Sequence, residues 1–286
     1  MMKIIDAHLH FSATPHFKNT ALNAGHLDTL EHLQHVFHEQ NIVLGIGMGV
    51  DGKDNNQQIS YPLTINFGKV SHPKFLVQCL GIDTAAITKE NAQESLQAFE
   101  ARVKDTDVVG LKVYAGYQHF HVNDPVYHPF YTLAEQYDIP VVIHTGDTAN
   151  AAGLLKYSHP LTVDEVAVNF PRVRFVMAHY GNPWIVDATE VAKKNPNVYI
   201  DLSGLAEGKF SVDWFYENYH GYLEQIKTWL TYLSRYDKIM YGSDWPLVNM
   251  QNYVELIKRL IPEEHQQAVF YDNATKVFSK INAWLK

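Results

Sequence analysis

Histidine and aspartate occur near the ends of several apolar runs in this sequence. The first run, residues 4–11, reads IIDAHLHF and contains His8 and His10, two residues apart. On an extended strand every second side chain lies on the same face, so Asp6, His8 and His10 are expected to share one face. Two imidazoles at this spacing can reach one cation, and histidine is the commonest metal ligand. The same spacing is also compatible with two polar histidines at a fraying strand end.

Three later apolar runs end in the same kinds of residue. The run VVI leads into His144, FVMA leads into His179, and MYGS leads into Asp244. Taken separately, each could be a core histidine, or an aspartate that caps the following helix. Four run ends that all carry His or Asp indicate a shared ligand set instead. Such ligands are typical of Zn²⁺ and similar divalent cations, with one coordination position left for water.

The elements that would position these residues follow a regular alternation. Short apolar runs alternate with longer stretches of helical periodicity, which is typical of βαβ units and a parallel sheet. The eight expected strands are residues 4–8, 42–48, 75–81, 108–113, 140–144, 173–179, 198–202 and 239–243. The longer expected helices are residues 27–40, 87–103, 125–137, 183–194, 222–236 and 252–260, with a shorter one at residues 162–170.

Eight βα units within 286 residues favour an α/β fold of the closed (β/α)8 TIM-barrel type over an open doubly wound sheet. The Gly-x-Gly-x-x-Gly motif of open dinucleotide-binding sheets does not follow the first run. Residues 263–285 are expected to form a C-terminal closing helix over the bottom or side of the barrel. No linker or repeat divides the chain, so residues 1–286 are expected to form one domain. Because such barrels carry their active sites at the C-terminal strand ends, the His and Asp residues should converge there.

The order of these residues resembles the amidohydrolase superfamily of metal-dependent barrels. The resemblance rests on DAHLHF at residues 6–11, on His144 and His179, and on GSD at residues 242–244; it extends from residue 4 to about residue 278. Three phrases resemble the amidohydrolase-2 group in particular, which includes aminocarboxymuconate semialdehyde decarboxylase. They are VVIHTGD at residues 141–147, VYIDLS at residues 198–203 and DNA at residues 272–274. The resemblance leaves the substrate open.

The resemblance implies a divalent cation, with Zn²⁺ expected, held by His8, His10, His144 and Asp244. His179 would lie beside the bound water, as an acid or base or as a further ligand. Lys112 bears on the number of ions, because binuclear members of the superfamily bridge two ions with a carboxylated lysine at the end of the fourth strand. In that case His144 and His179 would both serve the second ion. One ion is favoured, with Lys112 as a free amine near the site.

The expected chemistry is hydrolysis of an amide, ester or lactone of a small molecule by a metal-activated water. Asp244 would act as general base and then acid, and His179 would hydrogen-bond the water or the oxyanion. The residues expected to contact the substrate are Lys112, Tyr114, Tyr180 and Trp245.

The alternative reaction at the same metal site is decarboxylation of a small unsaturated or aromatic carboxylic acid. A substrate carboxylate needs nearby cations, but the chain has few arginines, and most are expected on helices or on the wrong side of strands. Hydrolysis is therefore favoured. A barrel that binds a metal or ligand without turnover also stays open.

Composition narrows the classes of partner. The chain carries 23 Lys and Arg against 31 Asp and Glu, a formal net charge of −8, so charge gives no reason to bind nucleic acid or an anionic membrane. The single cysteine, Cys79, excludes an internal disulfide and suits a reducing compartment. No apolar stretch is long enough to span a bilayer. We therefore expect a cytoplasmic enzyme with a small-molecule substrate, and homodimerisation only as the commonest form of association.

Overall fold

The computed structural model describes residues 2–12, 17–49, 62–69 and 71–285, and its central feature is one eight-stranded parallel sheet. The strands are hydrogen-bonded in chain order, from β1 to β8. Their bounds are β1 (Ile4–Leu9), β2 (Ile42–Met48), β3 (Leu76–Ile82), β4 (Val108–Val113), β5 (Val141–Ile143), β6 (Phe175–Met177), β7 (Val198–Asp201) and β8 (Ile239–Met240).

The two ends of the sheet meet just beyond β8. The amide of Ala7 on β1 donates to the carbonyl of Tyr241 at 2.9 Å, and the amide of Asp244 donates to the carbonyl of His8 at 2.8 Å. Because these bonds join the first strand to the chain that follows the last one, the sheet curls into a barrel. The predicted (β/α)8 TIM barrel is confirmed.

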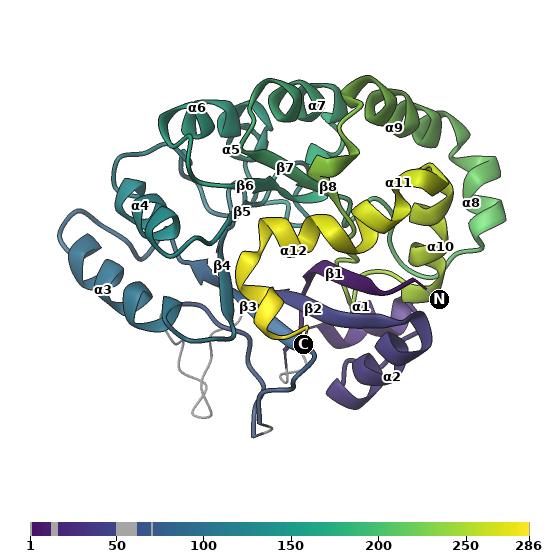
Figure 1. Ribbon diagram of the computed structural model, residues 1–286, viewed down its shortest axis with the longest axis horizontal. Coiled ribbons are helices and arrows are strands. Elements are labelled where there is room, and N and C mark those ends of the chain that lie inside the picture. The colour runs from purple at the N-terminus through teal and green to yellow at the C-terminus, as the bar shows by residue number, and fades with distance from the viewer. Residues whose placement is uncertain (1, 13–16, 50–61, 70, 286) are drawn as a thin grey trace.

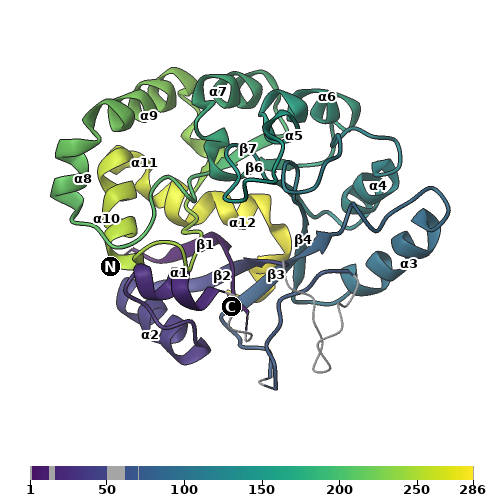
Figure 2. The same ribbon diagram turned by 180° about the vertical axis from the view of Figure 1, so that it is seen from behind.

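Helices surround the strands in both ribbon views (Figure 1 and Figure 2). The helix bounds are α1 (Lys18–Asn23), α2 (Leu30–Gln40), α3 (Ala92–Val103), α4 (His128–Gln136), α5 (Leu155–Ser158), α6 (Leu161–Asn169), α7 (Ile185–Lys194), α8 (Val212–Asn218), α9 (His220–Leu233), α10 (Met250–Leu260), α11 (Glu263–Gln267) and α12 (Asn273–Val277). The helices α1, α5 and α8 were not predicted, because they are too short to show helical periodicity. None of the helices in the described ranges is long and apolar enough to cross a membrane.

Helix capping explains why α2 begins later than its periodicity predicts. The Thr29 hydroxyl accepts the amide of His32, which makes Thr29 the N-cap, and the helix begins at Leu30 rather than at Leu27. Asn41, with φ of 56°, ends the helix in the left-handed conformation. Two residues at the ends of the helix thus set bounds that the apolar stripe alone does not define.

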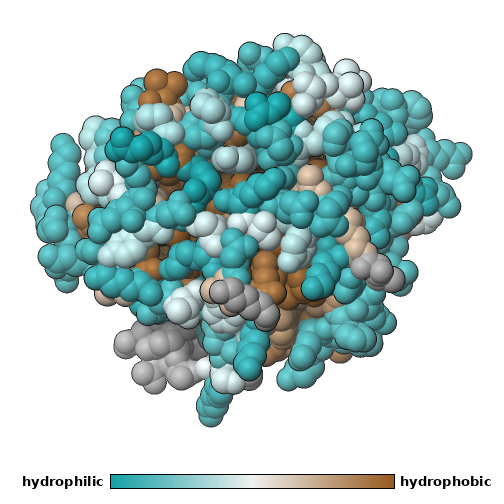
Figure 3. Space-filling model, viewed as in Figure 1, coloured by the Kyte–Doolittle hydropathy of each residue, from teal (hydrophilic) through white to brown (hydrophobic). Residues whose placement is uncertain are grey.

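Strand side chains alternate between the barrel interior and the layer beneath the helices. On β5, Val142 belongs to the interior cluster, whereas Val141 and Ile143 pack in the outer one. The outer surface seen in Figure 3 is largely hydrophilic, with apolar side chains visible between polar ones. Both apolar clusters therefore lie mainly inside the molecule, one within the strands and one around them.

The C-terminal segment closes the end of the barrel at which the strands begin. Phe278 and Ile281 pack into the interior cluster, and the Arg174 guanidinium, just before β6, donates to the carbonyl of Val277 at 2.8 Å. The predicted C-terminal closing helix is confirmed, although residues 263–285 are not α-helical throughout. A π-helical turn, Ala268–Asp272, separates α11 from α12, and within it the Val269 carbonyl accepts the amide of Tyr241 at 2.9 Å. The opposite end of the barrel remains available for a site.

Candidate active site

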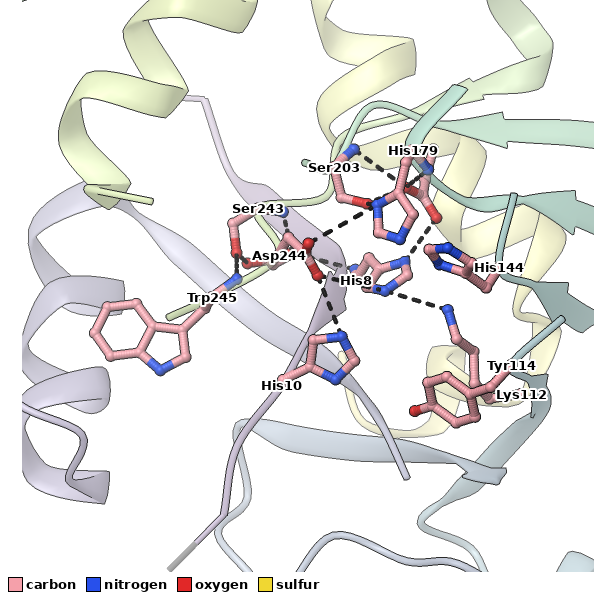
Figure 4. A network of polar contacts seen from close by, with 12 residues as sticks. His8, His10, Lys112, Tyr114, His144, His179, Ser203, Ser243, Asp244 and Trp245 are labelled. Atoms are coloured by element: carbon pink, nitrogen blue, oxygen red, sulfur yellow. Dashed lines mark hydrogen bonds and ion pairs between the residues drawn. The ribbon is translucent and has the colours of Figure 1, made fainter. Parts of the chain in front are cut away.

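Side chains from several strand ends meet at the C-terminal end of the barrel (Figure 4). His8 lies on β1, His10 directly follows this strand, and Asp244 comes from the loop after β8. Asp244 Oδ1 lies 3.2 Å from His10 Nε2 and 3.7 Å from His8 Nε2. The three residues offer ligand atoms that all lie within 4.8 Å of one another. Strand ends far apart in sequence thus form one compact cluster, as predicted.

The ligand atoms of this cluster fit a divalent cation. Asp244 Oδ1 is buried and faces two imidazole nitrogens, His10 Nε2 at 3.2 Å and His8 Nε2 at 3.7 Å. Burial alone would raise the pKa of Asp244, but His179, His10 and His8 beside it lower that pKa below its usual range. An ionised carboxylate and neutral imidazoles are the forms in which these groups bind a metal cation. Two imidazoles and one carboxylate form the ligand set of many catalytic zinc sites.

The buried histidines are in the uncharged form that metal ligation requires. Burial, reinforced by the neighbouring Lys112 cation, lowers the pKa of His8 to about 3, although Asp201 acts in the opposite direction. Burial likewise lowers the pKa of His179. Both imidazoles are neutral at physiological pH, so each has one nitrogen with a free lone pair.

Asp201, the last residue of β7, is a site residue that the sequence analysis missed. Its Oδ2 lies 2.9 Å from His8 Nδ1, and its Oδ1 accepts the backbone amides of His179 and Ser203, each at 3.1 Å. Ser203 Oγ also hydrogen-bonds Oδ1. The missed signal was of the same kind as for Asp244, since VYI is an apolar run that ends in a carboxylate. His8, His179 and Asp201 form a second close group of ligand-type atoms, but both Asp201 oxygens already have partners.

Asp6 fastens the loop after β8 to β1. Its Oδ1 accepts the amides of Ser243 at 2.9 Å and His8 at 3.2 Å, and its Oδ2 accepts the Ser243 hydroxyl at 2.5 Å. The pairing register shifts between Asp6 and Leu9, which interrupts the simple alternation expected for this strand. Asp6 therefore sets the backbone beside Asp244, rather than the ring of a ligand histidine.

Two site residues have left-handed backbone conformations. His179 and Asp244 each have φ of 61°, a region that residues other than glycine rarely occupy. The Asp201 carboxylate holds the amide of His179, and the Asp6 carboxylate holds the amide of Ser243, next to Asp244. Such conformations persist where surrounding contacts determine them, and they cluster at active sites.

Lys112 and Tyr114 lie where the sequence analysis placed them, near the end of β4. Lys112 is fully buried, and its Nζ is 3.4 Å from His8 Nε2. Burial lowers the pKa of Lys112 to about 8, while Asp201 and Asp244 raise it. The Tyr114 hydroxyl donates to the carbonyl of Gly49 at 2.9 Å. Both side chains line a cavity of about 570 Å³ that also contains His10, His179 and Asp244.

The remaining walls of this cavity are mixed in character. They are formed by Phe17, Thr20, Leu63, Tyr117, Gln118, His144, Ala149, Glu207 and Leu247. Among these described lining residues and those named above, Lys112 is the one lysine, and no arginine is present. The cavity is large enough for a small molecule and opens directly onto the histidine and aspartate cluster.

His144 lies beside the cluster but belongs to neither group of close ligand atoms. Its ring centroid is 4.9 Å from that of His179, and its Nε2 lies 2.9 Å from the carbonyl of Asp147. One of its two ring nitrogens is thus already engaged. The metal-ligand role of His144 stays a prediction.

The expectation that Tyr180 and Trp245 contact the substrate is not met by their positions in the structure. Both are fully buried in the outer core, and neither lines the cavity. The Tyr180 hydroxyl bonds Thr189 Oγ1 at 2.7 Å, and the Trp245 ring centroid is 4.4 Å from that of His26. Each follows a residue with left-handed φ, so the chain turns and carries the next side chain into the layer beneath the helices.

Comparison with solved structures finds the same fold in several bacterial proteins. An uncharacterised TIM-barrel protein from Bordetella bronchiseptica is 19% identical, with a TM-score of 0.69 over 98% of this chain and 100% of that chain. A probable 2-pyrone-4,6-dicarboxylic acid hydrolase from Acinetobacter baumannii is 17% identical, with a TM-score of 0.62 over 97% and 100%. A 2,6-dihydroxybenzoate decarboxylase from Rhizobium is 14% identical, with a TM-score of 0.65 over 98% and 99%. At these identities the likeness shows the fold alone.

Sequence comparison gives the family. No curated protein matches the chain. A family model described as amidohydrolase matches residues 82–280, which is more than half of the 286 residues. The match contains His144, His179 and Asp244, and it ends close to the C-terminal segment that closes the barrel. The chain belongs to the amidohydrolase family.

Proposed function

We propose that this protein is a metal-dependent hydrolase that cleaves an amide, ester or lactone bond of a small molecule. One observation carries the proposal: the buried Asp244 carboxylate faces the imidazoles of His8 and His10 at the wall of a cavity of about 570 Å³. The amidohydrolase family is generally metal-dependent, which agrees with this arrangement. From the donor set we propose Zn²⁺, as a single ion.

In this proposal the histidine and aspartate cluster binds the cation, and the cavity binds the substrate. His8, His10 and Asp244 would hold the cation, with His144 as a further proposed ligand. When bound, a divalent cation polarises a carbonyl group and makes water more acidic. Lys112 and Tyr114, on the cavity wall, would orient the substrate beside the cluster.

Asp244 and His179 are the residues placed to move protons. Asp244 Oδ2 lies 3.9 Å from His179 Nδ1, and both side chains line the cavity. Asp244 would accept a proton from the attacking water and return it to the leaving group, as general base and then acid. His179 would accept a hydrogen bond from the water, because it is neutral and faces the same cavity.

Decarboxylation of a small aromatic or unsaturated acid is the second candidate. One observation favours it: Lys112 brings a buried cation to the cavity, where it could pair with a substrate carboxylate. Against it, the arginines bond elsewhere, as Arg174 does to Asp138 and Arg259 to Asp213. A cavity with one lysine and two acidic residues, Asp244 and Glu207, suits a substrate of low negative charge better than a polycarboxylate.

The test compares both reactions on one preparation. Purified protein loaded with Zn²⁺ is assayed against panels of esters, lactones and amides, and against aromatic acids with detection of released CO₂. We expect hydrolysis without CO₂ release, and loss of turnover in Asp244→Asn with its metal content measured alongside. CO₂ release without hydrolysis would transfer the assignment to decarboxylation, and normal turnover by a metal-loaded Asp244→Asn variant would remove Asp244 from the mechanism.

A further inference from the structure

The hydrogen bonds around Asp201 contain enough information to locate protons. Oδ1 of this fully buried carboxylate accepts two backbone amides, those of His179 and Ser203, and it also contacts Ser203 Oγ. Oδ2 faces His8 Nδ1 at 2.9 Å. A backbone N–H can only donate and a carboxylate can only accept, so each contact has a defined direction.

The first consequence concerns His8. Oδ1 of Asp201 accepts hydrogens from two backbone amides and from Ser203 Oγ, and such hydrogen bonds to the charged form keep a carboxylate ionised. The 2.9 Å contact therefore needs a hydrogen on His8 Nδ1. Since His8 is neutral, its Nε2 has a free lone pair. Lys112 Nζ, a donor, lies 3.4 Å from that same nitrogen, which agrees independently.

The second consequence concerns His179. The Ser203 hydroxyl has one hydrogen, and its contact with the ionised Asp201 Oδ1 uses that hydrogen. Ser203 Oγ also lies 2.9 Å from His179 Nδ1, and in this contact the oxygen can only accept. The hydrogen of neutral His179 is therefore on Nδ1, which leaves its Nε2 free.

We propose that Asp201 and Ser203 are positioning residues that hold His8 and His179 in the Nδ1–H tautomer, so that Nε2 of each ring carries a lone pair. For His8 this is the nitrogen 3.7 Å from Asp244 Oδ1, where a cation would bind. For His179 it supplies a hydrogen-bond acceptor on a cavity-lining ring. The catalytic meaning of the tautomers rests on the proposed function, whereas their existence does not.

Nuclear magnetic resonance can read the tautomers directly. Metal-free protein with ¹⁵N-labelled histidine is studied at neutral pH by long-range ¹H–¹⁵N correlation, which distinguishes Nδ1–H from Nε2–H rings. The variants His8→Gln and His179→Gln assign the two signals among the 16 histidines. We expect Nδ1–H for both rings in the wild-type protein. An Nε2–H ring at either position would overturn the proposal for that residue, whatever reaction the enzyme catalyses.

Two variants separate the effects of the two positioning residues. In Asp201→Asn, the amide oxygen should keep the place of Oδ1, because two backbone amides donate there, so the amide nitrogen faces His8. His8 should then switch to Nε2–H, as in other sites where Asp→Asn beside a histidine produces the wrong tautomer. In Ser203→Ala, His179 should lose its preference for Nδ1–H while His8 keeps it. An unchanged His8 signal in Asp201→Asn would contradict the proposal.

A matched control and a binding measurement complete the design. Ser243→Ala removes a buried serine hydroxyl that bonds Asp6 and touches no imidazole, so both tautomers should stay unchanged. Zn²⁺ titration by calorimetry should show affinity about 10–100-fold weaker in Asp201→Asn, the usual cost of losing a partner of a metal-binding histidine. Ser203→Ala and Ser243→Ala should bind Zn²⁺ like the wild type. Equal affinity in Asp201→Asn would contradict the role of Asp201, and if that variant does not fold, the Ser203→Ala spectra still test the proposal.

Discussion

Two hydrogen-bonded aspartate–serine pairs lie close to the candidate site, and they differ in the groups that they contact. Asp201 is the last residue of β7 and bonds Ser203 just after it, whereas Asp6 on β1 bonds Ser243 after β8; all four side chains are buried. The pKa values of the two carboxyl groups nevertheless differ. Burial raises the pKa of Asp6 to about 7, but at Asp201 the contact with His8 and the other hydrogen bonds outweigh burial and lower the pKa.

The difference lies in the partner, since an imidazole contacts one carboxylate and not the other. Asp201 contacts His8, and Ser203 contacts His179, so the β7 pair reaches two rings of the candidate site. Asp6 and Ser243 bond each other and backbone amides. A buried aspartate beside a serine therefore does not by itself indicate a functional role. The imidazoles that Asp201 and Ser203 contact are what connect this pair to the candidate site.

The largest expected effect comes from Asp201→Asn. Because His8 should then carry hydrogen on Nε2, we expect turnover of the substrate found by the assay panels to fall on the order of 10³-fold, about 4 kcal/mol in transition-state stabilisation. Steady-state kinetics at saturating Zn²⁺ measure it, with thermal unfolding to confirm that the barrel is intact. A fall in turnover of less than tenfold would show that the Asp201–Ser203 pair has only a structural role, like the Asp6–Ser243 pair.

Ser203→Ala should have an intermediate effect. The variant leaves the contact between Asp201 and His8 in place but frees the ring of His179, so metal binding survives while proton transfer is impaired. We expect kcat to fall about tenfold, or about 1.4 kcal/mol, with KM little changed. The kcat and KM values are measured beside those of Ser243→Ala, and equal kcat in the two serine variants would remove the distinction between the pairs.

Ser243→Ala should affect stability rather than turnover. It removes the hydroxyl that donates to Asp6 Oδ2 at 2.5 Å and that accepts the amide of Trp245 at 2.9 Å. We expect the free energy of unfolding to fall by about 1–2 kcal/mol, the usual cost of removing one partner of buried hydrogen bonds. Urea denaturation measures it. A loss of zinc affinity without loss of stability would show that this pair also acts on the site.

The smallest effect is expected from Asp6→Asn. An amide oxygen can still accept the two amides at the Oδ1 position, and the Ser243 hydroxyl can turn to accept from the amide nitrogen. We expect a change in unfolding free energy below about 1 kcal/mol and near-normal kcat. We therefore expect an aspartate-to-asparagine substitution to leave kcat almost unchanged at Asp6 and to lower turnover strongly at Asp201. Severe loss of activity in Asp6→Asn would show that its charge matters and would weaken the comparison.

Much of the fold could be predicted from local patterns. The apolar runs at residues 108–113 and 42–48 match β4 and β2, because strand periodicity depends on neighbouring residues only. The π-helical turn within the closing helix could not be predicted, since it lies where the Val269 carbonyl accepts the amide of Tyr241 from a distant part of the chain. Contacts between distant elements decided such details.

The candidate site divides in the same way. Residue type and position at apolar run ends were enough to bring His8, His10 and Asp244 together, because the strands of a barrel all end at one rim. The position of Tyr180 could not be predicted, since the left-handed φ of His179 turns the next side chain outward.

Local sequence was therefore sufficient to bring histidines and a carboxylate to one rim, because the alternation of strands and helices dictates where strand ends lie. It carried no information on which carboxylate is ionised, which nitrogen of His8 holds the hydrogen, or which serine bonds an imidazole. Those properties depend on burial and on partners such as Asp201, which is 193 residues from His8 along the chain and 2.9 Å from it in space. The charge of a carboxyl group and the tautomer of an imidazole depend on which groups lie within a few ångströms, and only the folded structure determines those neighbours.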